Sequence, residues 1–165
     1  MILKKLSLVL LTNFLFFAGT LKAQEQIDKS AFYASMADDD INKIDMQLKL
    51  IDASPITEKN AYSGALLMKK AGLLKGAGNK LNIFKQGHKK LEAAITKNNT
   101  NTEFHFLRLM IQENAPKILG YKNDMQKDSD LIKKSYKDLP QVVRHAIADY
   151  SKKSKLLKPQ DFNLQ

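Results

Sequence analysis

The chain contains no cysteine, and that absence removes several kinds of chemistry. It excludes disulfide bonds, a cysteine nucleophile, cysteine-ligated metals and a lipid anchor attached to a cysteine at a cleavage site. Exported domains that are too small to form a sufficient core usually add disulfides. This chain must therefore be stabilised by its hydrophobic core, without covalent cross-links.

Arginine is scarce, although the chain is strongly basic. The formal net charge is +10, yet 25 of the 27 basic residues are lysines and only Arg108 and Arg144 are arginines. The planar guanidinium group favours two-pronged recognition of phosphate, which a lysine ammonium cannot reproduce. The composition therefore favours a lysine-rich, solvated surface over a specific phosphate site.

Long hydrophobic runs are missing after residue 23, and the one near the N-terminus has the layout of a secretory signal. Two lysines precede an apolar segment, 6–17, and small residues then lead to Ala23. This layout predicts a signal peptide over residues 1–23, cut between Ala23 and Gln24, although Leu21 stands where such sites prefer a small residue. The alternative is an uncut membrane anchor, which is disfavoured because the run is shorter than the roughly 20 residues of a membrane span.

Removal of the signal leaves residues 24–165, in which no segment is long and apolar enough to span a membrane. The expected location is therefore secreted or periplasmic. A domain of about 142 residues buries roughly 68–70% of its unfolded surface, which is enough for one hydrophobic core. We therefore expect a single helical domain over residues 24–165.

The remaining chain lacks the strict alternation of apolar and polar residues that marks strands. Ile41, Ile44, Leu48 and Ile51 instead fall at spacings of three, four and three, which places them on one face of a helix. The pattern predicts an all-α fold with antiparallel helix pairs, about six or seven helices in total, arranged as a tetratricopeptide-like array or an irregular bundle. The expected helices cover residues 27–37, 41–51, 55–73, 80–97, 102–114, 123–136 and 140–150.

Capping and breaking residues predict where the first helices begin and end. The aspartates at 38–40 precede a helix, where negative charge is favourable, so we expect a cap rather than a cation site. Ser54-Pro55 predicts a helix start, with serine as the cap and proline at the first helical position. Gly76 to Asn79 predicts a break in the chain, and its spacing excludes a phosphate-binding loop.

The second half of the chain carries similar markers. Asn101 or Thr102 is expected to cap a helix that is apolar on more than one side, which predicts that this helix is buried. Ala115-Pro116 is expected to end it. At the C-terminus, Phe162 is expected to dock the tail onto the fold.

Charge is distributed unevenly along the expected mature chain. Residues 24–65 hold 4 lysines and 8 acids, whereas residues 66–97 hold 8 lysines and 1 acid. The basic stretch is either a solvated helix surface or a surface that binds anionic partners such as lipid headgroups, acidic glycans or an acidic protein. The candidate residues for anionic-surface binding are Lys69, Lys70, Lys75, Lys80, Lys85, Lys89, Lys90 and Lys97.

One stretch resembles the second helix of a tetratricopeptide repeat. Gly87, Leu91, Ala94 and Asn99 match its small, large, small and turn positions at spacings of four, three and five. The resemblance covers about 35 residues and implies a helical repeat that binds a partner in a groove. It departs from the family pattern at Asn99, where proline is usual, and it departs further in the next helix.

In that next helix His105, Arg108 and Leu109 occupy the positions of the family's large residue, leucine and glycine. Two further segments, 64–72 and 103–116, resemble a family of small exported proteins of unknown function from Gram-negative bacteria. That second resemblance implies export and a helical fold, and it implies no activity.

No motif for catalysis or metal binding is present in the sequence. His88, His105 and His145 each stand alone, without the spacing that pairs histidines on a metal. His105 is expected to be a hydrogen-bonded core histidine, because its helix is strongly apolar. His88 and His145 are expected at the surface.

Charged residues of the second half are assigned structural roles. Asp124, Asp128 and Asp130 are expected on a solvated helix face, where nearby lysines can pair with them. Arg108 lies in the most apolar helix, flanked by Glu103 and Glu113, and a buried charge requires a partner. We therefore predict that Arg108 contacts an acid inside the fold.

These observations favour an exported, non-catalytic interaction or scaffold module with a protein or peptide partner in the cell envelope. The alternative is a binder of anionic lipid or glycan surfaces through residues 69–97, with nucleic acid the least expected anion. A third hypothesis is an enzyme whose site is assembled from distant residues. No catalytic residue, cofactor or metal is assigned.

Overall fold

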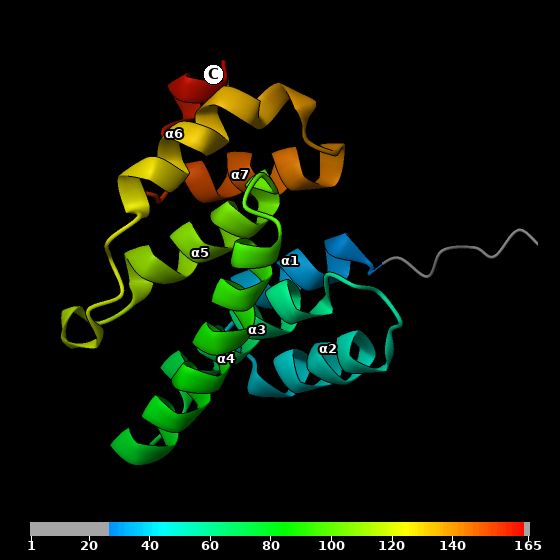
Figure 1. Cartoon of the computed structure of the whole chain (residues 1–165), viewed down its shortest axis with the longest axis vertical. Coiled ribbons are helices and arrows are strands. Elements are labelled where there is room, and N and C mark those ends of the chain that lie inside the picture. Colours follow the sequence, from blue (N-terminus) through cyan, green and yellow to red (C-terminus); the bar gives the residue numbers. More distant parts are fainter. Residues whose placement is uncertain (1–26, 164–165) are drawn as a thin grey trace, which may run out of the picture.

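The computed structural model describes residues 27–163, and within that range the chain forms seven α-helices, short 3-10 turns and no strand (Figure 1). The predicted all-α fold is confirmed, whereas the tetratricopeptide-like arrangement stays a prediction. The predicted signal peptide and its cleavage site at Ala23 and Gln24 lie outside the described residues. The helices are α1 (Lys29–Ala37), α2 (Ile41–Ala53), α3 (Lys59–Leu73), α4 (Ala77–Lys97), α5 (Thr102–Asn114), α6 (Met125–Ser135) and α7 (Gln141–Ser151).

Two helix starts are capped as the sequence predicts. The Asp40 carboxylate accepts hydrogen bonds from the backbone N–H groups of Asn42 and Lys43, at 2.8 and 3.4 Å. The Asn101 side chain accepts in the same way from Glu103 and Phe104. Each cap satisfies N–H groups that have no partner within the first turn of the helix.

Two predicted boundaries are wrong. Ser54 ends α2 instead of starting α3: its N–H bonds to the carbonyl of Ile51, and its ψ of 140° is the extended conformation that a following proline favours. The next helix begins only at Lys59. Helix α4 begins at Ala77 and not at Lys80, because Gly76, with its φ of 82°, is the only residue of the predicted break 76–79 that is not helical.

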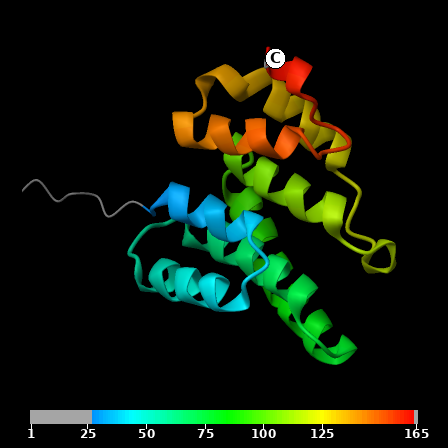
Figure 2. The ribbon, with the colours of Figure 1, turned by 180° about the vertical axis from the view of Figure 1, so that it is seen from behind.

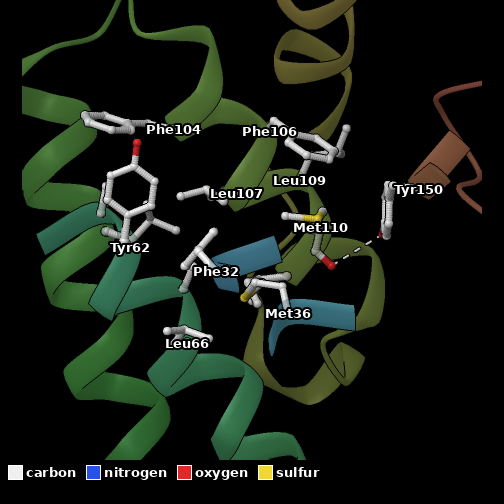
Figure 3. Close-up of a cluster of buried hydrophobic side chains, with 14 of the residues drawn as sticks. Phe32, Met36, Tyr62, Leu66, Phe104, Phe106, Leu107, Leu109, Met110 and Tyr150 are labelled. Atoms are coloured by element: carbon white, nitrogen blue, oxygen red, sulfur yellow. Dashed lines mark hydrogen bonds between the residues drawn. The ribbon is translucent and has the colours of Figure 1, made fainter. Parts of the chain in front are cut away.

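Helix α5 forms the centre of the fold, and every residue from Thr102 to Gln112 is buried. Figure 3 shows its aromatic and aliphatic side chains against those of α1 and α3. The Phe32 and Tyr62 rings meet edge to face at 5.0 Å between centroids, and Tyr62 meets Phe104 in the same way at 6.2 Å. The predicted burial of this helix is confirmed.

Helices α3 and α4 are joined by three residues and pack closely at a contact between two glycines (Figure 1). A Cβ atom built on Gly87 would lie 2.5 Å from the carbonyl oxygen of Gly64, and one built on Gly64 would lie 2.8 Å from the carbonyl oxygen of Gly87. No real Cβ contact is that short, so the two backbones can approach this closely only because both residues lack a side chain.

The acidic start of the chain folds against the basic middle. Lys69 pairs with Asp39, and Lys70 pairs with Asp45. A third pair joins Lys90 of α4 to Asp52 of α2, with 3.7 Å between the ammonium nitrogen and the carboxylate oxygen. The polarity seen along the sequence is therefore partly neutralised in the folded protein.

The C-terminal tail docks as predicted. Phe162 is buried and its ring lies 4.5 Å from that of Tyr136, which follows α6. Asp161 beside it pairs with Lys133 of α6 at 3.1 Å. Within residues 27–163, no helix combines the length and the apolar character needed to cross a membrane.

We expect Gly87→Ala to destabilise the protein by about 1–3 kcal/mol, because the new methyl group meets the Gly64 carbonyl and the helices must separate. The matched control is Gly72→Ala in α3, where a Cβ atom meets nothing within 4 Å. At position 72, the higher helix propensity of alanine relative to glycine should raise the free energy of unfolding by up to about 1 kcal/mol. Urea denaturation of both variants measures the effect, and equal stabilisation by the two would refute close glycine packing.

Candidate functional site

A groove of about 800 Å³ lies on one face of the molecule. It is bounded by α1, α3, α4, the end of α5, the turn that follows α5, and α7. Figure 2 shows α1 and α7 side by side on this side of the fold. Apolar lining residues include Tyr33, Met36, Met68, Leu73, Leu81, Phe84, Met110, Ile111, Ile118, Leu119, Val142, Ala146 and Tyr150.

Two walls of the groove are helix faces that the other residues of 27–163 leave exposed on α1 and partly exposed on α7. On α1 the lining positions include Ser30, Ala34 and Ala37, and on α7 they include Val142 and Ala146. Spacings of three and four place each set on one side of its helix. Because these side chains are small, an occupant of the groove can approach both helix backbones closely.

Methionine is concentrated in the groove. Met36, Met68 and Met110 come from three different helices and all line it. Methionine is unbranched and polarizable, so it adapts to occupants of different shape. Figure 3 shows Met110 beside Tyr150, whose hydroxyl oxygen lies 3.5 Å from the Met110 carbonyl oxygen.

The far walls of the groove expose large apolar side chains. Leu81 is 40% exposed because the first half of α4 extends beyond α5 (Figure 1). Ile118, in the turn Lys117–Leu119, is 93% exposed. Both residues line the groove. An apolar occupant would cover surface that these side chains now present to water.

The rim of the groove is basic. Three lysines but only one acid line it, and that acid, Asp149, already pairs with Lys152 at 2.8 Å. Lys69 is neutralised by Asp39. Among residues 27–163, Lys80 and Lys153 have no acid partner: the Lys80 ammonium donates to the Gly72 carbonyl at 3.4 Å, and the Lys153 ammonium lies 5.5 Å from the centre of the Tyr150 ring.

The eight candidate lysines do not share one environment. Lys69 and Lys80 line the groove, whereas Lys70 and Lys90 pair with acids of α2. The remaining four, Lys75, Lys85, Lys89 and Lys97, are exposed away from the groove.

A buried polar network lies between α4, α5 and α6. The Arg108 guanidinium donates two hydrogen bonds to Asp128, both at 2.7 Å, and one to Glu92 at 3.0 Å. The prediction that Arg108 contacts an acid inside the fold is confirmed. The expectation for Asp128 is wrong: its side chain is fully buried, because it faces Arg108 across the α5–α6 contact while Asp130 faces solvent.

The charges of this network stabilise one another. Burial alone would raise the pKa of the Asp128 carboxyl, but hydrogen bonds from Arg108 and His105 outweigh it and hold that pKa below its ordinary value. For the Arg108 guanidinium, burial alone would lower the pKa. Its hydrogen bonds to Asp128 and the negative charge of Glu92 outweigh burial, so the pKa lies above its ordinary value.

His105 belongs to this network and is a core histidine, as predicted. Its Nδ1 lies 2.7 Å from Asp128 Oδ1, and its Nε2 lies 2.9 Å from the carbonyl oxygen of Asn99. The ring is 3% exposed and does not line the groove. Both nitrogens are occupied by protein groups, so the His105–Asp128 pair has the geometry of a structural contact between helices.

The other histidines lie elsewhere. His145 is exposed on the groove rim, as expected of a surface residue. His88 is partly buried, contrary to its expected surface position, because the Tyr121 ring packs on it at 4.6 Å between centroids. Within the described part of the chain, no group of three histidine or carboxylate side chains is arranged to hold a metal ion.

The network also supports one wall of the groove. The Tyr121 hydroxyl donates to the free oxygen of Glu92, whose other oxygen accepts from Arg108. The Tyr121 ring then packs edge to face on Phe84, a groove residue, at 5.8 Å between centroids. Tyr121, which follows the turn after α5, is thereby fixed to α4 at two points.

Replacement of Asp128 by asparagine should cost about 3–5 kcal/mol of unfolding free energy, because it leaves the Arg108 cation buried without its main counter-charge. Asp130→Asn, two positions along the same helix, is the matched control and should change stability by less than about 0.5 kcal/mol. Urea denaturation at pH 7 provides the comparison. An equally small effect at both positions would contradict the structural role of the network.

The same variant should change how stability depends on pH. Folding lowers the pKa of Asp128. The ionised carboxylate therefore makes its full contribution to the free energy of unfolding above the unfolded-state pKa of about 3.9, and this contribution is lost as the pH falls through the folded-state pKa. The stability difference between the natural protein and Asp128→Asn should therefore narrow below about pH 4. A difference that stays constant from pH 7 to pH 3 would contradict this assignment.

Comparison of the chain with family models, with curated proteins and with solved structures found no match in any of the three. The function therefore has to be argued from the groove and its rim.

Proposed function

We propose that this chain is an exported, non-catalytic binding module of the cell envelope, and that the groove is its binding surface. The observation that carries the proposal is the groove itself: an apolar hollow of about 800 Å³ whose walls come from α1, α3, α4, α5 and α7. Sites that bind partner molecules are concave and mostly apolar, with few polar groups.

Three further features support binding rather than catalysis. His105, Arg108 and Asp128 hydrogen-bond to one another across the contact between α5 and α6, and none of them lines the groove. The titratable side chains that line the groove are lysines, tyrosines, His145 and Asp149, and Asp149 already pairs with Lys152. Large apolar side chains at the rim, such as Ile118, favour an occupant with an apolar part.

The alternative function is the binding of anionic lipid or glycan surfaces through residues 69–97. Ion pairs of Lys69, Lys70 and Lys90 with acids from the start of the chain weaken it, because they reduce the net charge of this segment. Its signature would be binding that fades steeply as salt is raised.

Export can be tested at the N-terminus. If the signal is removed as proposed, the protein recovered from the periplasm or culture medium begins at Gln24, because the cut follows Ala23. N-terminal sequencing or intact-mass measurement checks this. Recovery of the uncut chain with the membrane fraction would overturn the export proposal and support the anchor.

The groove can be tested with Nile red, a neutral dye that fluoresces in apolar surroundings. We expect saturable binding at one site of the exported protein and a loss of about tenfold or more in affinity for Ala34→Trp, which fills the groove from an exposed position of α1. The matched control is Ala93→Trp at an exposed position of α4 outside the groove, which should bind as the natural protein does.

The same variants identify a natural partner. A component of an envelope extract that is retained at high salt by the natural protein and by Ala93→Trp, and lost from Ala34→Trp, binds in the groove. Material retained equally by all three proteins, and only at low salt, would favour the alternative function. Absence of Nile red binding by the folded natural protein would overturn the groove as a binding surface.

A further inference from the structure

The lining of the groove distinguishes among apolar occupants. Its walls are helices, in which backbone N–H and carbonyl groups hydrogen-bond to one another. An extended peptide placed there would bury its own backbone groups without partners, at a cost in free energy. A hydrocarbon chain has no such groups, so it can be buried there without that cost.

The size and plasticity of the groove suit a single chain of this kind. The volume of about 800 Å³ falls within the range of about 300–1,000 Å³ that is usual for small-molecule sites. Met36, Met68 and Met110 line it, and methionine side chains adjust to a flexible apolar occupant.

The rim specifies the charge of the occupant. Lys80 and Lys153 carry charges that no acid among residues 27–163 neutralises, and the one acid of the lining, Asp149, is paired with Lys152. The Lys80 ammonium has a single long bond of 3.4 Å to a backbone carbonyl. A carboxylate or phosphate at this rim would gain charge-assisted hydrogen bonds, whereas a cationic group would be repelled.

We propose that the groove binds a single-chain anionic amphiphile, with its hydrocarbon chain between α1, α4 and α7 and its anionic head paired with one of the two rim lysines that lack an acid partner, Lys80 or Lys153. A fatty acid and a lysophospholipid share this chemistry. This inference rests on the proposed function of the groove and names the class of ligand that the groove takes.

The experiment measures displacement of Nile red by amphiphiles that share a dodecyl chain and differ in the head. The probes are dodecanoate, dodecanol and dodecyltrimethylammonium, at pH 8 and low salt. The two ionic probes are kept below their micelle concentrations, and dodecanol is kept below its solubility limit. We expect dodecanoate to displace the dye at a concentration about tenfold lower than dodecanol, with the cationic probe weakest. A parallel titration with dodecanoyl lysophosphatidylglycerol compares a phosphate head with the carboxylate.

Charge variants connect the preference to the rim. Lys80→Glu with Lys153→Glu should abolish the advantage of dodecanoate over dodecanol. Lys85→Glu with Lys89→Glu makes the same change of net charge at exposed positions of α4 outside the groove and should keep the advantage. If the first double variant unfolds, Lys80→Gln with Lys153→Gln replaces it.

The outcomes separate this inference from the proposed function. Equal displacement by the three heads, or equal loss of preference in both double variants, overturns the anionic amphiphile and leaves the groove a binding surface. Capture of a protein by the groove, with no displacement by any dodecyl probe, overturns it as well. Only the failure of Nile red itself to bind the natural protein removes the proposed function.

Discussion

Helix α5 is buried along almost its whole length and still carries charged side chains, so the fold must supply partners for them. Buried charges are tolerated only when they are paired and hydrogen-bonded. Glu103 accepts from Lys29 and Tyr33 of α1, and Arg108 donates to Asp128 of α6. At the other end of α5, Glu113 accepts from the Tyr150 hydroxyl of α7 and from two backbone N–H groups of the tail at 155–156. Among the described residues, the side-chain oxygen of Gln112 is the exception and has no partner.

Two of these hydrogen bonds also position side chains that line the groove. Tyr33 and Tyr150 line it, and each hydroxyl donates to a carboxylate of α5. Burial is the main cause that raises the pKa of both tyrosines above the ordinary value, and Glu103 beside Tyr33 and Glu113 beside Tyr150 raise it further. Both hydroxyls are therefore neutral donors at physiological pH. Because these hydrogen bonds fix two residues of the wall, little ordering of these side chains would oppose the proposed binding.

The charges of the chain divide into two kinds. Several of those that the sequence pattern singles out serve the fold, as in the pairs between the acidic start and Lys69, Lys70 and Lys90. Lys80 and Lys153 are different, because they stand at the rim of an apolar hollow without an acid partner among residues 27–163. That combination supports a binding surface for an amphiphile rather than a general affinity for anions.

The sequence alone determined the all-α class, capping within Asp38–Asp40 and at Asn101 or Thr102, the burial of α5 and the need of Arg108 for an acid. Periodicity, capping and the cost of an unpaired buried charge are local properties of the chain. The start of α3 was predicted wrongly, since Ser-Pro marks a helix end as well as a helix start. Only the tertiary structure decided that Asp128 is that acid, that Leu81 is exposed, and that α1 and α7 leave small side chains uncovered. Each depends on which faces of distant helices meet, and the amphipathic pattern of one helix does not specify its neighbour.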